Sequence, residues 1–242
     1  MSLAYRDGEA TASIAALLSV SQIQISEVSS RRDRDSFIKF PWRIYETDPA
    51  WVPPLLIERK AFLDRENHPF YRHGDAALFL ARRNDEIVGR IAASDDPNYN
   101  ALHRLNIGCF GLFESIDDVD VASALFGAAN NWLRQRGRRE IIGPVDYSTN
   151  YVCGLLIDGF QHPPTILTAH NPPYYARLIE ANGFVKEVDW YAWWFDPKNA
   201  PVSRLRRLVD ARTKKTSVKV RSIDLRNLAG ESQRLAAVFN EA

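Results

Sequence analysis

The chain is poor in sulfur-containing residues, with two cysteines and one methionine among its 242 residues. Cys109 and Cys153 are too few for a disulfide framework and form no CxxC pair. A reducing cytoplasm is the simplest setting for such a chain. We therefore expect a soluble, cytoplasmic protein.

An excess of charge of one sign is also missing. Thirty-one basic residues against thirty acidic ones leave a formal charge of +1, so nothing global recruits a polyanion or an acidic membrane surface. No apolar stretch is long enough to span a bilayer. The first twenty residues lack the basic front and long apolar run of a signal peptide. We expect neither a nucleic-acid partner nor a membrane partner.

Metal-binding patterns are absent as well. None of the five histidines pairs with another at ligand spacing, and no HExxH motif occurs. We therefore expect no metal site. Cys109 stands within an apolar strand pattern, where a small buried thiol is a simpler interpretation than a nucleophile.

Several segments have the period of β-strands. Residues 22–28 alternate apolar and polar side chains. Residues 77–83 and 86–93 are joined by Asn84-Asp85, which predicts a hairpin. Residues 106–115 form another predicted strand, which we expect to lie next to the hairpin, and its glycines suggest a bulge or a close backbone approach.

Two segments have the spacing and punctuation of helices. Residues 118–136 carry an apolar stripe, with Asp117 or Asp118 able to cap the start and Gly137 able to end the helix. A second helix is predicted from an N-cap at Asn171 to Gly183. The helical spacing over residues 37–45 is expected to break at Pro41.

The remaining pattern suggests how the chain is divided. Further strands are predicted at 140–145, 165–168 and 184–195, a short basic helix at 203–212, a strand at 217–223 and a helix at 228–242. We expect an arm over 1–20, a domain over 21–200 and a linker with a short helix over 201–216. Residues 217–242 would begin a second unit that stops inside a helical pattern.

Three local motifs resemble the GNAT superfamily of acyl-CoA N-acyltransferases. Residues 79–89 look like its central hairpin, and residues 171–184 look like its last helix with the Gly-Phe that follows. A broader set resembles a bacterial GNAT-like family in which a second GNAT-like half follows the first; it comprises residues 40–45, 48–54, 143–144 and 171–175. The resemblance implies an α/β fold, with a mixed sheet of about six or seven strands and helices on both faces.

The resemblance also implies a chemistry and its residues. In GNAT proteins a bulged strand splays from its neighbour, the pantetheine arm of the donor lies in the gap, and a backbone N–H stabilises the oxyanion. Acetyl-CoA or another acyl-CoA would be the co-substrate, and a small-molecule or peptide amine the acceptor. The matching positions are Phe110, Gly111, Leu112 and Phe113 for the donor, Tyr175 and Asn150 for catalysis, and Ser148, Asn171 and Tyr174 for the acceptor.

The chain departs from the GNAT pattern in two places. Asp117, Asp118 and Asp120 stand where a glycine-rich turn would hold the CoA pyrophosphate, and carboxylates repel it. Ile179 occupies the position of the tyrosine that protonates the leaving thiolate, although Tyr174 or Tyr175 could substitute. Two hypotheses remain open: an acyl-CoA-dependent N-acyltransferase, or a catalytically silent GNAT-like binding or structural domain.

The last unassigned feature is a dense aromatic run at Trp190, Tyr191, Trp193, Trp194 and Phe195. It could line an acyl pocket or contact a partner, while a strand buried on both sides explains the pattern equally well.

Overall fold

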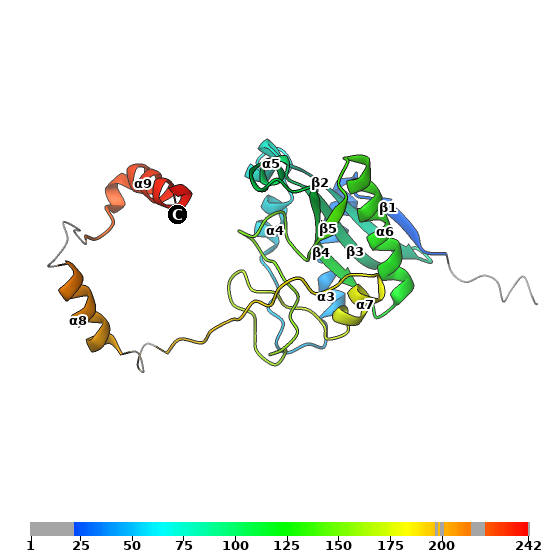
Figure 1. Cartoon of the computed structure of the whole chain (residues 1–242). Coiled ribbons are helices and arrows are strands. Elements are labelled where there is room, and N and C mark those ends of the chain that lie inside the picture. Colours follow the sequence, from blue (N-terminus) through cyan, green and yellow to red (C-terminus); the bar gives the residue numbers. More distant parts are fainter. Residues whose placement is uncertain (1–21, 197, 199–200, 214–220, 242) are drawn as a thin grey trace, which may run out of the picture. The chain divides into compact units, whose positions relative to one another are not determined.

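The structure is a computed structural model that describes residues 22–196, 198, 201–213 and 221–241 (Figure 1). The expected arm over 1–20 lies outside the described residues. The chain divides into two compact units, one extending to Trp190 and the other beginning at Tyr191. Each unit is described by itself below.

A five-stranded mixed sheet forms the centre of the first unit. Its strands, in both sequence and spatial order, are β1 (Gln24–Glu27), β2 (Asp75–Arg83), β3 (Glu86–Asp95), β4 (Ile107–Ser115) and β5 (Glu140–Ile142). Neighbours are antiparallel except β4 and β5, which are parallel. Asn84 and Asp85 both adopt positive φ, as a two-residue hairpin turn requires. The predicted hairpin and its place beside β4 are confirmed.

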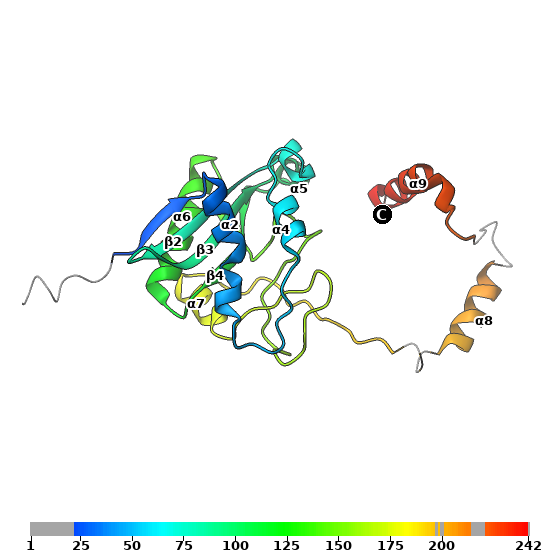
Figure 2. The ribbon, with the colours of Figure 1, turned by 180° about the vertical axis from the view of Figure 1, so that it is seen from behind.

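Helices cover both faces of the sheet because its strands place apolar side chains on both sides (Figures 1 and 2). Helices α6 (Val119–Gln135) and α7 (Tyr175–Ala181) cover one face, where Ile91 and Phe110 are fully buried. The other face packs against α2 (Arg31–Lys39), α4 (Leu56–Phe62) and the 3-10 helix η1 (Pro69–Arg72). The predicted fold class is confirmed.

Local sequence signals explain where several helices begin and end. α2 stops at Lys39 and the short α3 (Pro41–Ile44) starts at Pro41, as the proline predicted. Asp118 caps α6, again as predicted. A further short helix, α5 (Pro97–His103), connects β3 to β4 and is capped by Asp96.

Some strand predictions are wrong, so the described part of the sheet has five strands instead of six or seven. Residues 165–168 form a turn with a hydrogen bond from Thr168 N–H to the Thr165 carbonyl, and Ile166 is exposed. Residues 184–195 form no strand, because no segment among the described residues pairs with their backbone. The strand predicted at 140–145 is shorter than expected and ends at Ile142. Residues 217–220 lie outside the described residues, and 221–223 are not a strand.

The second unit consists of α8 (Val202–Thr213), the 3-10 helix η2 (Leu225–Asn227) and α9 (Leu228–Glu241). Both predicted helices are therefore confirmed. Leu235, Val238 and Phe239, which helical spacing places on one face of α9, are exposed. Among the residues that the structure describes, no helix has the length and apolar character needed to cross a membrane.

Candidate functional site

The central feature of the first unit is a bulge near the end of β4. Arg90 pairs with Glu114 and Ala92 with Gly111, so two residues of β4, Leu112 and Phe113, stand opposite one residue of β3. Leu112 adopts a φ of 48°, in the left-handed region. Parallel pairing with β5 ends at Cys109, just before the bulge. β4 therefore has the bulge that its glycines predicted, and the bulge follows the point where β4 stops pairing with β5.

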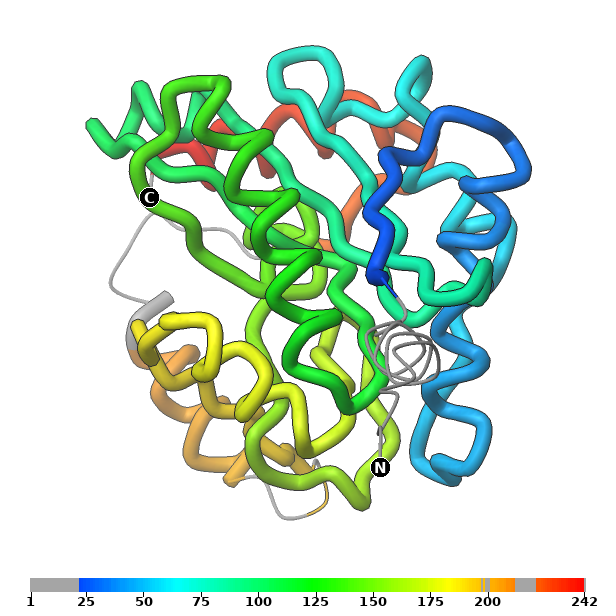
Figure 3. Tube along the Cα trace, turned by 90° about the vertical axis from the view of Figure 1, so that its right-hand side faces the viewer, coloured from blue at the N-terminus to red at the C-terminus, as the bar shows by residue number. Residues whose placement is uncertain are grey.

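The segment after β5, whose course the Cα trace of Figure 3 follows by colour, contacts the bulge. Val145 N–H donates to the Phe110 carbonyl at 2.7 Å, and Leu112 N–H donates to Asp146 Oδ1 at 2.8 Å. A Cβ on Gly111 would stand 2.3 Å from the Val145 carbonyl oxygen. Burial raises the pKa of Asp146. A carboxylate of the protein itself therefore accepts from the bulge N–H, which the GNAT resemblance would assign to an acyl donor.

A buried polar cluster lies at the end of β4, and we call Glu114, Tyr45, Tyr175 and Arg90 the Glu114 cluster. Tyr45 and Tyr175 donate hydroxyl hydrogen bonds to the same oxygen of Glu114, at 2.9 and 2.7 Å. Arg90 approaches the other carboxylate oxygen at 3.5 Å and donates to the Phe37 carbonyl at 2.7 Å. Both tyrosines are almost fully buried. The cluster joins α3, β3, β4 and α7 through one carboxylate.

Burial dominates the electrostatics of this cluster. It raises the pKa of Glu114, while the Arg90 guanidinium and the two phenols partly oppose that shift. Burial and the neighbouring Glu114 carboxylate raise the pKa of both Tyr45 and Tyr175. The phenols therefore keep their protons and act as donors to the carboxylate. A carboxylate with a raised pKa and fixed donors is suited to hold or pass a proton.

A second polar pair adjoins the cluster. The Nε2 atom of His170 lies 2.8 Å from Oδ2 of Asp48, and the His170 carbonyl oxygen lies 3.2 Å from the Tyr45 hydroxyl. Partial burial raises the pKa of Asp48, but the hydrogen bonds from His170 and from backbone N–H groups outweigh it and hold the pKa below its usual value. The pair ties the segment after α3 to the segment before α7, and so helps to position Tyr45.

The four residues predicted to hold an acyl donor lie on β4, where groups of the protein itself contact each of them. Phe110 and Phe113 point into the core beneath α6 and are buried. Gly111 is covered by Val145, and the N–H of Leu112 is bonded to Asp146.

The predicted catalytic and acceptor residues separate into two groups. Tyr175 belongs to the Glu114 cluster and also accepts from Ser115 N–H at 2.9 Å, while Tyr174 donates to the Ser115 carbonyl at 2.7 Å. Ser148 and Asn150 lie together in a turn, where Asn150 N–H donates to Ser148 Oγ at 3.3 Å. Among the described residues, no hydrogen bond or ion pair joins the Glu114 cluster to that turn.

The prediction that Asn171 caps the second helix is wrong. α7 begins at Tyr175, and Tyr174 precedes it without a side-chain cap. The Asn171 side chain instead accepts from Leu156 N–H at 2.7 Å and donates to the Leu156 carbonyl at 3.2 Å. Two prolines follow Asn171, and the residue before a proline is disfavoured in helical conformation. Asn171 thus holds the long segment before α7 in place.

The acidic start of α6 is paired with arginines. Asp118 accepts from the N–H groups of Asp120 and Val121 at 2.9 and 3.3 Å, and it forms an ion pair with Arg83 at 2.8 Å. Asp117 forms an ion pair with Arg177. The helix N–H groups that would hold a phosphate are therefore satisfied by Asp118, which also explains why the sequence has aspartate there.

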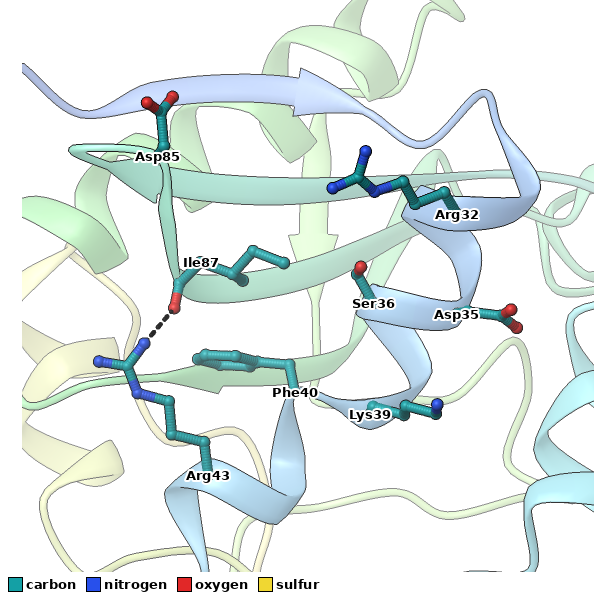
Figure 4. A pocket seen from close by; sticks show the side chains of 8 residues that line it. All are labelled: Arg32, Asp35, Ser36, Lys39, Phe40, Arg43, Asp85 and Ile87. Carbon is teal, nitrogen blue, oxygen red and sulfur yellow. Dashed lines mark hydrogen bonds between the residues drawn. The ribbon is translucent and has the colours of Figure 1, made fainter.

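Two hollows of the first unit lie away from the Glu114 cluster. An open depression of about 720 Å³ lies over α2, α3 and the β2–β3 hairpin (Figure 4). Its lining mixes Arg32, Lys39 and Arg43 with Asp35 and Asp85, and Arg43 donates to the Ile87 carbonyl at 2.9 Å. A cavity of about 40 Å³ beside Cys109 and Ser148 is too small for a pantetheine arm. Burial raises the pKa of Cys109 to about 12, consistent with an unreactive thiol.

Sequence reasoning missed Glu114, Arg90, Tyr45 and Asp146. A signal was available for two of them, because Arg90 and Glu114 are charged residues inside otherwise apolar strands. A charge in a buried strand needs a partner, and these two form one pair. Tyr45 and Asp146 carry no comparable signal, since their partners are remote in the sequence. Within the described residues, no group of three His, Cys, Asp or Glu side chains could hold a metal ion.

Comparison with known proteins gives two curated relatives. Protein YghO of Escherichia coli K12 is 39% identical over 212 residues, which cover 87% of this chain and 54% of that protein. The bacterial ceramide synthase of Caulobacter vibrioides is 34% identical over 226 residues, which cover 91% of this chain and 57% of that protein. No protein-family model matches the chain. The chain thus spans about half the length of the curated relatives it matches.

Solved structures with a similar trace are more distant. A putative acetyl transferase from Pyrococcus furiosus has 16% identity and a TM-score of 0.43, with 72% of this chain and all of that chain covered. A tandem GNAT protein from the clavulanic acid biosynthesis pathway has 13% identity and a TM-score of 0.43, with 67% of this chain and 43% of that chain covered. Likenesses this distant say nothing about substrate or mechanism.

Proposed function

We propose that this chain is part of an acyl-CoA-dependent N-acyltransferase whose acceptor is a long-chain amine. The observation that carries the proposal is the 34% identity to a bacterial ceramide synthase over 91% of the chain. A ceramide is the amide of a fatty acid and a long-chain amino alcohol. The order of strands and helices, which follows the GNAT resemblance, and the bulged β4 support the same reaction class.

The proposed reaction is a transfer of an acyl group from sulfur to nitrogen. The amine nitrogen attacks the thioester carbonyl, the amide bond forms and the carbon–sulfur bond breaks. The amine loses one proton, and the leaving thiolate of CoA takes one up. Glu114 would accept the amine proton, because its carboxylate is buried with a raised pKa. Tyr175, at 2.7 Å from Glu114, would return a proton toward the thiolate.

The donor would lie along β4, where Leu112 N–H points at Asp146. Displacement of the Asp146 carboxylate would free this N–H for the oxyanion of the tetrahedral intermediate. The sites proposed for the acceptor remain Tyr174, Asn171 and Ser148, with Asn150 beside Ser148.

The test is an assay of the purified protein with palmitoyl-CoA and sphinganine, following free thiol release and the mass of the amide product. Glu114→Gln keeps the acceptor oxygen for both phenols and should lower the rate at least about 100-fold. Glu180→Gln, at an exposed position of α7, is the matched control and should leave the rate unchanged. Thermal unfolding of each variant separates loss of activity from loss of fold. An unchanged rate in Glu114→Gln would exclude Glu114 as the base.

A catalytically silent GNAT-like binding or structural domain is the second candidate. It is favoured by the two places where the protein's own carboxylates occupy the N–H groups expected to bind CoA, Asp146 at Leu112 and Asp118 at α6. Titration calorimetry with acetyl-CoA and then palmitoyl-CoA discriminates between the two candidates. Binding of either ester favours the enzyme. Absence of heat with both esters at millimolar concentration favours the silent domain.

The second unit fits the same proposal. We propose that residues 217–242 begin a second GNAT-like half, as in the tandem family that the sequence resembles, and that the protein is cytoplasmic. The share of the curated relatives that the chain covers supports a further half in those proteins.

A further inference from the structure

The net charge of +1 conceals an uneven distribution along the chain. Residues 191–221 contain nine basic and two acidic side chains, a local formal charge of +7, so the rest of the chain carries −6. The near-neutral total was our reason to expect no membrane partner. That reason does not apply to a segment with its own strong positive charge.

Helix α8 (Val202–Thr213) lies within this basic segment and is amphipathic. At 100° per residue, Val202, Leu205 and Leu208 fall within an arc of about 120°. Their side chains are 57%, 51% and 61% exposed. Arg204 and Arg206 border this apolar arc on its two sides, each about 40° beyond it. A helix of this kind presents aliphatic side chains with cations beside them.

Exposed aromatic side chains lie just before the helix. Tyr191, Trp193, Trp194 and Phe195 are 75%, 88%, 91% and 67% exposed. Seven residue steps separate Phe195 from Val202, a reach of at most about 25 Å. Tryptophan and tyrosine prefer the boundary between water and hydrocarbon, where an apolar ring and a polar atom are both accommodated. Aromatic, aliphatic and cationic groups are thus combined in one short stretch of chain.

We propose that the aromatic residues at 191–195 and helix α8 dock on the surface of a lipid bilayer that contains anionic lipids. Charge complementarity selects the partner. If the apolar arc faces the acyl chains of a bilayer, the arginines on its two sides lie at the level of the phosphate headgroups. A nucleic acid would use the cations and the aromatic rings, but it would leave Leu205 and Leu208 without an apolar environment. Docking goes beyond the proposed acyl transfer and does not depend on it.

The test is co-sedimentation of the purified protein with vesicles of phosphatidylcholine alone and of phosphatidylcholine with phosphatidylglycerol. We expect binding to the anionic vesicles, weakened by salt. Each basic residue near such a surface strengthens partitioning about five-fold, so Arg204→Glu, Arg206→Glu and Arg207→Glu together should weaken it at least about 100-fold. The control reverses Arg31, Arg72 and Arg139, which are exposed in the first unit. It makes the same change in net charge and should retain most of the binding.

A second measurement locates the contact. Tryptophan fluorescence should shift to the blue on vesicle binding, and Trp193→Ala with Trp194→Ala should remove most of the shift, because both rings are exposed in the free protein. Equal loss of binding in both arginine variants would overturn the proposal, since total charge would then be responsible. Binding to DNA with no binding to vesicles would assign the segment to nucleic acid. Dimerisation through α8 with no vesicle binding would assign it to a second copy.

Discussion

At the scale of single residues, the close approach of the chain to β4 decides what the bulge can do. Gly111 admits the Val145 carbonyl, and Gly143 admits the Phe110 carbonyl, since a Cβ on Gly143 would lie 2.4 Å from that oxygen. Both contacts are between backbone atoms, which cannot rotate away as a flexible side chain can. The glycines therefore set the distance between β4 and the segment after β5.

Replacing Gly111 by alanine should accordingly destabilise the protein by about 1–3 kcal/mol, because the new methyl group collides with the Val145 carbonyl. Gly127→Ala is the matched control. A Cβ on Gly127 meets nothing within 4 Å, and its place in α6 should make alanine stabilising by about 0.5–1 kcal/mol. Urea unfolding of both variants measures the difference. Equal stability of the Gly111→Ala and Gly127→Ala variants would show that the segment after β5 moves away from the new methyl group without a cost in free energy.

Asp146 should make stability depend on pH. Burial raises its pKa in the folded protein. The stabilising contribution of Asp146 to the free energy of unfolding is therefore fully present below the pKa of an aspartate in the unfolded chain, about 3.9. It is lost as the pH rises through the pKa of Asp146 in the folded protein. Asp146→Asn keeps an oxygen for Leu112 N–H but carries no charge. Its free energy of unfolding should therefore rise relative to wild type between pH 4 and pH 8.

The measurement for Asp146→Asn is chemical denaturation at several pH values. Asp146→Ala serves as the comparison, since it also lacks the charge but leaves the buried Leu112 N–H without its acceptor, and it should be about 1–3 kcal/mol less stable than Asp146→Asn at every pH. A difference between Asp146→Asn and wild type that stays constant with pH would contradict the buried charge.

At the scale of elements, the start of α6 combines two aspartates with separate tasks. Asp118 caps the helix and pairs with Arg83, so its replacement changes stability as well as charge. Asp117 accepts no helix N–H in the structure and pairs with Arg177. The sequence suggested that these aspartates act together to repel the CoA pyrophosphate. In the structure the two positions have different partners and must be considered separately.

Asp117→Asn should strengthen the binding of CoA several-fold at low salt, because it removes a carboxylate near the expected diphosphate and frees Arg177. The gain should shrink at high salt, where surface charges are screened. Titration calorimetry with CoA measures it, with Asp120→Asn as a control that removes an exposed charge in the first turn of the same helix. If both variants bind CoA alike, Arg177 has no part in holding the phosphates.

At the scale of the whole molecule, the division at residue 190 should be visible to proteases. Residues 184–195 form no strand, and the large apolar side chains from Val185 to Phe195 are exposed. Chymotrypsin at low concentration should cut first at this aromatic run. The product expected is a resistant fragment that contains the sheet, identified by mass spectrometry. First cuts within β2 to β4 instead would show that the first unit is not the stable part.

The sequence alone determined the elements whose signals are local. The Asn84-Asp85 turn predicted the β2–β3 hairpin, Pro41 predicted the break between α2 and α3, and Asp118 predicted the start of α6. Each of these depends on backbone conformation or on hydrogen bonds within a few residues. The bulge in β4 was also predicted from its glycines, and so was the place of β4 beside the hairpin.

The tertiary structure decided what no local pattern contains. Glu114 meets Tyr45 and Tyr175 across 69 and 61 residues of chain, and Leu112 meets Asp146 across 34. The aromatic alternation at 184–195 has the period of a strand but no pairing partner among the described residues, because a strand also needs a neighbour to satisfy its backbone. Local sequence fixes the conformations a segment prefers. Contacts between distant segments fix which buried charges and donors meet, and these contacts exist only once the chain is folded.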